Sequence, residues 1–208
     1  MNSAINRNKR KYNTVISGMK VLISIFFIFL CVPVIGQTGT YRLVTATGAS
    51  STMVIRSMQS TVVADVFAWW NIPSGTHGTF SGKGTRFGNS SIIKEKDDPS
   101  CTLKLTFVEK QLKVQFSGCN RQNLTDDFSG NYNQLTLRTH GTYRTRPAKT
   151  YFHKYPRLTK TRKNYLRKGT QVQVDIENIV DDRWVYVNYR DNMGKVSSGY
   201  ILWSDLGQ

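Results

Sequence analysis

The chain has 208 residues, with 29 lysines and arginines against 13 acidic residues and a formal net charge of +16. That length excludes a large multidomain protein and leaves room for one medium domain or two small ones. The strong positive charge favours anionic partners.

Residues 1–36 have the layout of a secretory signal peptide. Five cations and no acid precede an apolar run at 21–35, which closes at Gly36. About fifteen apolar residues fall short of the roughly twenty that span a bilayer. We therefore predict cleavage after Gly36 and a periplasmic or secreted protein with no membrane span after cleavage; the alternative is an uncleaved membrane anchor. Cleavage would lower the formal charge to about +11.

Two cysteines, Cys101 and Cys119, follow the signal peptide. Two cysteines in an oxidising compartment usually pair. Metal binding is the alternative, but neither cysteine has a histidine or cysteine at zinc spacing. We predict a structural disulfide, no metal site and no cofactor.

Residues 37–138 repeatedly show short runs in which apolar and polar residues alternate, separated by Gly, Pro, Asn and Asp. The predicted strands are 40–47, 52–58, 62–70, 79–87, 91–94, 102–107, 112–116 and 130–137. The stretch 60–70 also fits a short helix, although its β-branched and aromatic content favours a strand. The fold prediction is all-β, with a small disulfide-stapled β-barrel or sandwich in this region.

A Gly-x-Tyr sequence occurs at the first predicted strand, Gly39–Thr40–Tyr41, and again at the last, Gly130–Asn131–Tyr132. The repetition indicates a barrel whose first and last strands meet. For about a hundred residues, an interior filled by side chains is expected rather than a ligand cavity.

The segment 139–170 contains ten cations and no acid, interleaved with tyrosine and phenylalanine. We predict a basic linker at 139–150. A field of this kind attracts anionic partners, and a solvated face that aids solubility is the alternative. Nucleic acid fits the composition equally well, but export argues against it. The candidate anion-binding residues are Arg144, Arg146, Lys149, Arg162 and Lys163.

The last sixty residues contain three further strand patterns: Gly169 before Val172–Gln173–Val174, Trp184–Val185–Tyr186–Val187, and Gly199–Tyr200–Ile201. Their order resembles the bacterial Src-homology-3-like domain. The resemblance implies a small bacterial Src-homology-3-like barrel at 151–208. Tyr200 departs from the tryptophan that is usual at its position.

In such domains the ligand groove lies between the long first loop and the turn before the last strand. The resemblance therefore implies groove-lining aromatic residues and a cation for a ligand carboxylate or phosphate. The candidate ligand-binding residues are Tyr151, Tyr155, Tyr165 and Trp203, with Arg157 or Lys160 as the cation. Trp184, Val187 and Tyr200 are expected in the core.

No catalytic motif is visible, because His77, His140 and His153 are scattered and both remaining cysteines are expected to be oxidised. We expect a protein that is not an enzyme. The predicted function is an exported, non-catalytic binding protein of the bacterial envelope that engages an anionic envelope polymer, a peptide or a protein partner through its C-terminal module. The alternative is a secreted inhibitor or immunity protein against a cell-wall-degrading enzyme.

Overall fold

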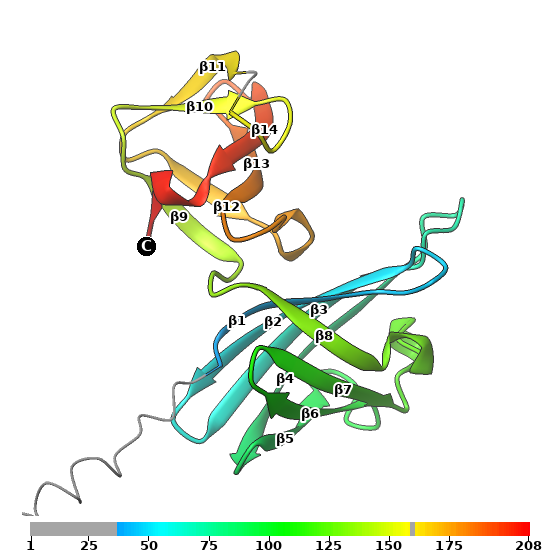
Figure 1. The fold of residues 1–208 in the computed structure, drawn as a ribbon. Helices are drawn as coiled ribbons and strands as arrows, with labels where there is room; N and C mark the ends of the chain where they lie inside the picture. The colour runs from blue at the N-terminus through cyan, green and yellow to red at the C-terminus, as the bar shows by residue number, and fades with distance from the viewer. Residues whose placement is uncertain (1–36, 159–160) are drawn as a thin grey trace, which may run out of the picture. The chain divides into compact units, whose positions relative to one another are not determined.

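The computed structural model describes residues 37–158 and 161–208, without the side chains of residues 161 and 162 (Figure 1). This part of the chain consists of β-strands joined by turns and by short 3-10 helices. The predicted all-β class is confirmed.

The first eight strands close into an antiparallel barrel in which each strand pairs with its sequence neighbours and β1 pairs with β8. They are β1 (Gly39–Val44), β2 (Ser50–Met58), β3 (Thr61–Trp69), β4 (His77–Phe87), β5 (Ser90–Glu95), β6 (Thr102–Val108), β7 (Gln111–Ser117) and β8 (Gly130–Thr136). The barrel is therefore confirmed over the sandwich. The stretch that also fitted a helix is strand β3, in which every second residue is buried.

Alternation between the two faces of each strand fills the barrel interior. On β6 and β7 the buried residues are apolar and their neighbours are polar or exposed. The largest interior side chains form one continuous hydrophobic cluster, among them Tyr41, Met53, Phe116, Phe128 and Tyr132. The interior of the barrel is thus a packed core.

The first Gly-x-Tyr sequence, Gly39–Thr40–Tyr41, lies where β1 pairs with β8, and this position accounts for its glycine. Gly39 has φ +156°, and a Cβ added there would lie 2.6 Å from the carbonyl oxygen of Thr136, so only glycine fits. Two residues later, Tyr41 is buried and donates its hydroxyl hydrogen to the carbonyl oxygen of Gln37 at 3.1 Å. Burial raises the pKa of Tyr41 to about 12.

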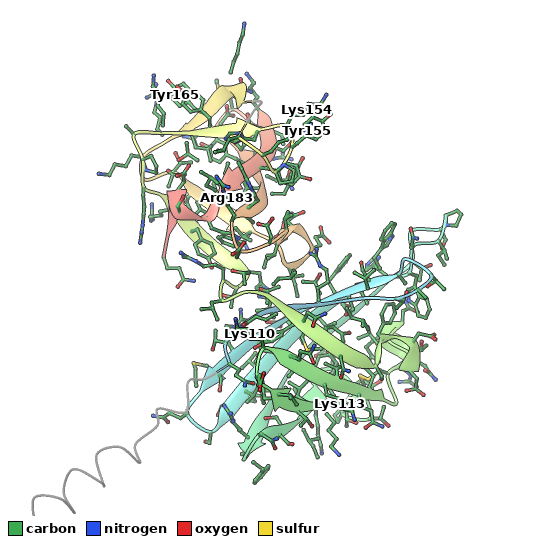
Figure 2. All side chains as sticks on the ribbon, viewed as in Figure 1. Lys110, Lys113, Lys154, Tyr155, Tyr165 and Arg183 are labelled. Atoms are coloured by element: carbon green, nitrogen blue, oxygen red, sulfur yellow. A yellow bond between two sulfur atoms is a disulfide. The ribbon has the colours of Figure 1, made fainter. Side chains whose placement is uncertain are left out.

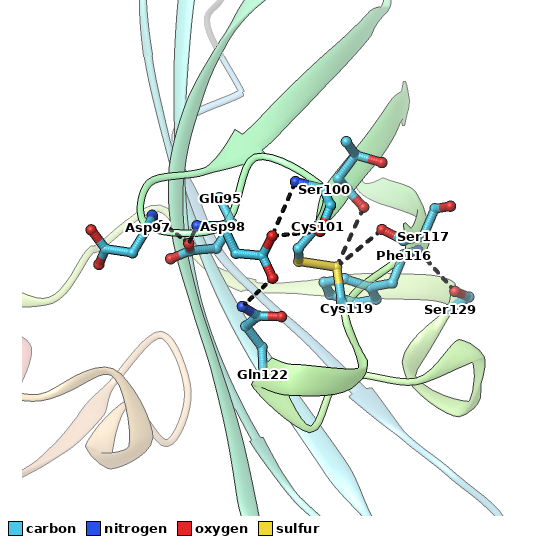
Figure 3. Close-up of a disulfide and its surroundings, with 11 residues drawn as sticks. Glu95, Asp97, Asp98, Ser100, Cys101, Phe116, Ser117, Cys119, Gln122 and Ser129 are labelled. Atoms are coloured by element: carbon cyan, nitrogen blue, oxygen red, sulfur yellow. Dashed lines mark hydrogen bonds between the residues drawn. A yellow bond between two sulfur atoms is a disulfide. The ribbon is translucent and has the colours of Figure 1, made fainter.

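A disulfide joins Cys101, directly before β6, to Cys119, directly after β7 (Figure 3). Cys119 opens a loop that contains the short 3-10 helices η1 (Asn120–Gln122) and η2 (Asp126–Phe128). The Trp70 ring packs edge-on against Phe128, with centroids 4.7 Å apart. The predicted disulfide is confirmed, and it holds this loop against the end of the barrel.

Asp98 links the turn between β5 and β6 to the same loop. Its carboxylate accepts hydrogen bonds from the Ser100 hydroxyl at 2.5 Å and from the Gln122 side-chain amide at 3.3 Å (Figure 3). These hydrogen bonds lower the pKa of Asp98, because they favour its charged form.

A second sheet of seven strands follows, in the order β11-β10-β14-β13-β12-β9-β15. Its strands are β9 (Gly141–Thr145), β10 (Lys149–His153), β11 (Thr161–Arg167), β12 (Gln171–Val174), β13 (Trp184–Arg190), β14 (Val196–Leu202) and β15 (Leu206–Gly207), with 3-10 helices η3 (Ile176–Asn178) and η4 (Trp203–Asp205).

The predicted basic linker at 139–150 differs from the structure. Gly141–Thr145 is strand β9, paired with both β12 and β15, and Lys149 opens β10. Tyr143 is buried in this strand and donates its hydroxyl hydrogen to the carbonyl oxygen of Thr139 at 2.7 Å. One buried tyrosine among cations is too weak a pattern to predict a strand.

The core of the second sheet includes Val172, Val185, Val187 and Ile201. Trp203 belongs to the same core: it is 2% exposed, and its indole N–H donates to the carbonyl oxygen of Asp181 at 3.1 Å. The prediction that Trp203 lines a ligand groove is therefore wrong. Trp184 and Val187 lie in the core as expected, whereas Tyr200 is only partly buried.

Candidate anion-binding face

The β10–β11 hairpin separates its apolar and cationic residues by the alternation of its strands. Thr150, Phe152 and Leu166 are buried. His153 at the end of β10 is also buried, whereas five cations and tyrosines of the two strands are exposed: Lys149, Tyr151, Lys163, Tyr165 and Arg167. We call these five residues the β10–β11 face.

Cross-strand pairing brings the aromatic residues of this face together. Tyr151 lies opposite Tyr165, with ring centroids 5.6 Å apart and planes inclined by 55°. Lys149 lies opposite Arg167, and the Lys149 ammonium is 5.0 Å from the centroid of the Tyr165 ring. The pairing therefore makes two adjacent aromatic surfaces bordered by cations, an arrangement that can stack on a flat or ring-shaped group and attract an anion beside it.

A second cation–aromatic cluster follows β10 in the chain. The Tyr155 ring lies 5.3 Å from the Lys154 ammonium and 4.9 Å from the Arg157 guanidinium, and all three side chains are exposed. Figure 2 labels Tyr165, which belongs to β11, and Tyr155, which follows β10 outside the strands. The structure thus places Tyr151 with Tyr165, and Tyr155 with Arg157, in two clusters.

A shallow depression of about 480 Å³ adjoins the β10–β11 face. It lies between β11 and the turn that joins β13 to β14. Its lining residues are Tyr165, Leu166, Arg167, Thr170, Tyr189, Asp191, Asn192 and Met193. The Asp191 carboxylate accepts hydrogen bonds from the backbone N–H groups of Met193 and Lys195, both at 2.9 Å, which fixes the turn. Two residues of the β10–β11 face therefore also line a preformed hollow.

Arg144 and Arg146 do not join this face. Arg144 lies in β9 and Arg146 directly follows it, and β9 is separated from β10 by three strands in the sheet order. Arg144 donates to the carbonyl oxygen of Gly169 at 3.1 Å, and Arg146 packs against Gly207. Lys160 lies outside the described residues, and Arg162 belongs to β11 but its side chain is not described.

Sequence reasoning missed Arg167, Tyr189 and Met193 as parts of the site. Arg167 could have been found, because it follows Tyr165 by two residues and therefore shares its face of the strand. The other two come from β13 and its turn, and only the fold brings them to β11.

The three histidines lie in separate settings. His77 is exposed and stacks on Phe67. His153 is buried, with its ring edge-on to Trp184 at 4.9 Å. His140 contacts Arg56 at 3.1 Å. Within 37–158 and 161–208, no three His, Cys, Asp or Glu side chains are grouped so that they could hold a metal ion.

Comparison with known proteins finds no matching family model, no matching curated protein and no matching solved structure. Among the described residues, no helix is both long and apolar enough to cross a bilayer.

Proposed function

We propose that the protein is an exported, non-catalytic binding protein of the bacterial envelope that engages an anionic envelope polymer through the β10–β11 face. The observation that supports this most directly is the Tyr151–Tyr165 pair, bordered by Lys149 and Arg167 on one exposed surface. Tyrosine rings stack on sugar or peptide groups, while the cations attract phosphate or carboxylate.

The resemblance of the C-terminal strands to the bacterial Src-homology-3-like domain supports the same proposal. In this proposal the depression between β11 and the β13–β14 turn is the ligand groove. The groove expected from the resemblance lies between the long first loop and the turn before the last strand, and the depression adjoins the turn before β14.

Export agrees with the chemistry of the cysteines. The Cys101–Cys119 disulfide suits an oxidising compartment, and the layout of residues 1–36 is that of a secretory signal. Nothing in the proposal requires a reacting group, since the tyrosines and cations of the face only bind and orient a ligand.

Co-sedimentation with insoluble wall polymer tests the proposal. The protein should pellet with polymer that carries phosphate groups and remain in solution with the same polymer after the phosphates are removed. Lys149→Glu/Lys163→Glu should reduce the bound fraction by about tenfold or more, because two attractive charges become repulsive.

The matched control is Lys94→Glu/Lys96→Glu, which makes the same charge change on exposed positions in and directly after β5 in the barrel. Equal losses in both double variants would show non-specific charge attraction and contradict the proposed face. A protein that binds neither polymer but lowers the activity of a lysozyme or an amidase would instead support an inhibitor.

A further inference from the structure

We propose that one end of the barrel docks on an anionic lipid bilayer. The turns β2–β3, β4–β5 and β6–β7 share this end, because neighbouring antiparallel strands of a closed barrel alternate in direction. Backbone hydrogen bonds of 2.8 to 3.0 Å join them side by side, from Arg86 to Ser60, from Phe107 to Asn89 and from Gln134 to Lys110. We call this end the hairpin rim.

A large apolar residue occupies the same position in all three hairpins. Met58, Phe87 and Val108 each end a strand directly before a two-residue turn, and they are 61%, 74% and 50% exposed. Single exposed apolar residues are common on protein surfaces and need no explanation. Three at equivalent positions on one rim form an apolar edge that can enter the boundary between headgroups and acyl chains.

The turns that present these residues are tight. The first turn residue has a positive φ in each hairpin: +52° at Gln59, +59° at Gly88 and +51° at Glu109. Only the glycine adopts this conformation without strain, so the other two turns retain it against a steric penalty. The apolar residues therefore project from short hairpins and not from long loops.

Cations lie on the barrel wall behind the apolar edge. Lys113 is outward-facing two residues from the start of β7, and Lys83 is four residues from the end of β4. A strand rise of about 3.3 Å per residue puts these side chains roughly 7 to 13 Å from the rim. Their ammonium groups would thus reach anionic headgroups when the apolar edge enters the bilayer.

The turn and the loop at the opposite end of the barrel carry a small net negative charge. The turn between β5 and β6 holds Asp97 and Asp98 against Lys96, and the disulfide-bonded loop holds Asp126 and Asp127 against Arg121. Apolar Ile72 is also exposed there, but the carboxylates would be repelled by an anionic surface. The distribution of charge therefore favours the hairpin rim over the opposite end of the barrel as the surface that docks on the bilayer.

The described chain also begins at the hairpin rim. The Gln37 side-chain amide donates to the carbonyl oxygen of Glu109 in the β6–β7 turn at 3.3 Å. An apolar edge with lysines behind it matches the acyl-chain and headgroup layers of an anionic bilayer, which favours a bilayer over a protein as the partner of this surface.

Hydroxyl-radical footprinting of the full chain tests the proposal, with vesicles of phosphatidylethanolamine and phosphatidylglycerol as the probe. Met58 should be oxidised several-fold more slowly with vesicles than without them, while exposed Trp69 at the opposite end should keep its rate. Because Phe87→Asp retains residues 1–36, loss of Met58 protection in that variant separates docking through the rim from attachment through that segment.

Phe87→Asp should abolish the protection of Met58, because a carboxylate would enter the apolar edge, and Ile72→Asp should leave it unchanged. Near-ultraviolet circular dichroism checks that both variants remain folded. Unchanged Met58 oxidation with vesicles, or full Met58 protection in Phe87→Asp, would overturn the proposal.

Discussion

Three tyrosines share one local arrangement. Tyr41, Tyr132 and Tyr143 each follow a glycine by two residues, are buried, and donate the hydroxyl hydrogen to the carbonyl oxygen four residues earlier. The bond tethers the segment that enters β1, β8 and β9, in the manner of a tyrosine corner. Tyr41 and Tyr132 belong to the two Gly-x-Tyr sequences that predicted where the barrel closes. The third, Gly141–Thr142–Tyr143, was not recognised as a strand signal and marks the start of the second sheet.

Removal of one of these hydroxyl groups should destabilise the fold. Tyr132→Phe should lower the free energy of unfolding by about 1 kcal/mol, because the carbonyl oxygen of Phe128, 2.9 Å from the hydroxyl, loses its donor. Urea denaturation measures the change. The matched control is Tyr151→Phe at an exposed site, with an expected change within about 0.5 kcal/mol; equal effects of the two variants would contradict the tethering role.

His140 makes the stability depend on pH. Burial, with help from the neighbouring Arg56 guanidinium, lowers the pKa of His140 below its usual 6.5, and the Asp65 and Asp175 carboxylates oppose the shift. Arg56 also forms an ion pair with Asp65, whose other oxygen accepts from the Ser81 hydroxyl at 2.7 Å. The folded state therefore favours a neutral imidazole.

The sign of the pH effect follows from this shift. Between pH 6.5 and the lower pKa of the folded state, the unfolded chain binds the proton more strongly, so the free energy of unfolding should fall as the pH falls through this window. His140→Gln should flatten that part of the curve, measured by urea denaturation from pH 7.5 to about 5. A variant curve parallel to that of the wild type would exclude His140 as the source of the pH dependence.

At the scale of elements, the disulfide closes the β6–β7 hairpin and holds the loop that follows it. The two cysteines are 18 residues apart in the sequence and both are buried. Cys101→Ser/Cys119→Ser should lower the free energy of unfolding by about 3 kcal/mol in the chain-entropy picture. Polymer binding at a temperature where the variant is folded should be unchanged, since the β10–β11 face belongs to the other sheet; loss of binding by the folded variant would contradict this separation.

The barrel strands could be predicted closely because one face of each is buried and tight turns separate them. The alternation in β7, Gln111–Ser117, has no exception, and its observed ends lie within a residue of the prediction. Strands β9, β10 and β11 were not predicted as strands, because their outer faces carry cations and each has only one buried apolar residue: Tyr143, Phe152 and Leu166. Trp203 was misplaced because η4 turns its side chain into the core, which a period of two does not anticipate.

The candidate site was only partly predictable for the same reason. Tyr151 and Tyr165 could be named from composition, but their pairing depends on the register of β10 with β11. Arg144 and Arg146 are close to Lys149 in sequence and distant from it in the order of the strands. The prediction included Arg144 and Arg146 because they are close to Lys149 in sequence, and the predicted site was therefore too large. The contribution of Tyr189 from β13 depends on the fold and could not be predicted.

At the scale of the whole molecule, charge is divided among distinct surfaces rather than spread evenly. The second sheet gathers cations and tyrosines on β10 and β11, the barrel wall holds lysines near the hairpin rim, and the disulfide-bonded end holds carboxylates. We propose that this division lets two different parts of the chain bind two different anionic partners.

Titration calorimetry at increasing salt, with a soluble phosphate-bearing wall polymer, tests the central claim most directly. Wild-type affinity should fall steeply as salt rises, because screening weakens the cation–phosphate attraction. The variant Lys149→Gln/Lys163→Gln/Arg167→Gln should show a shallower slope, and Tyr151→Ala/Tyr165→Ala should lower affinity at every salt concentration without changing the slope. The same slope and affinity in wild type and both variants would contradict the claim that the β10–β11 face binds the polymer.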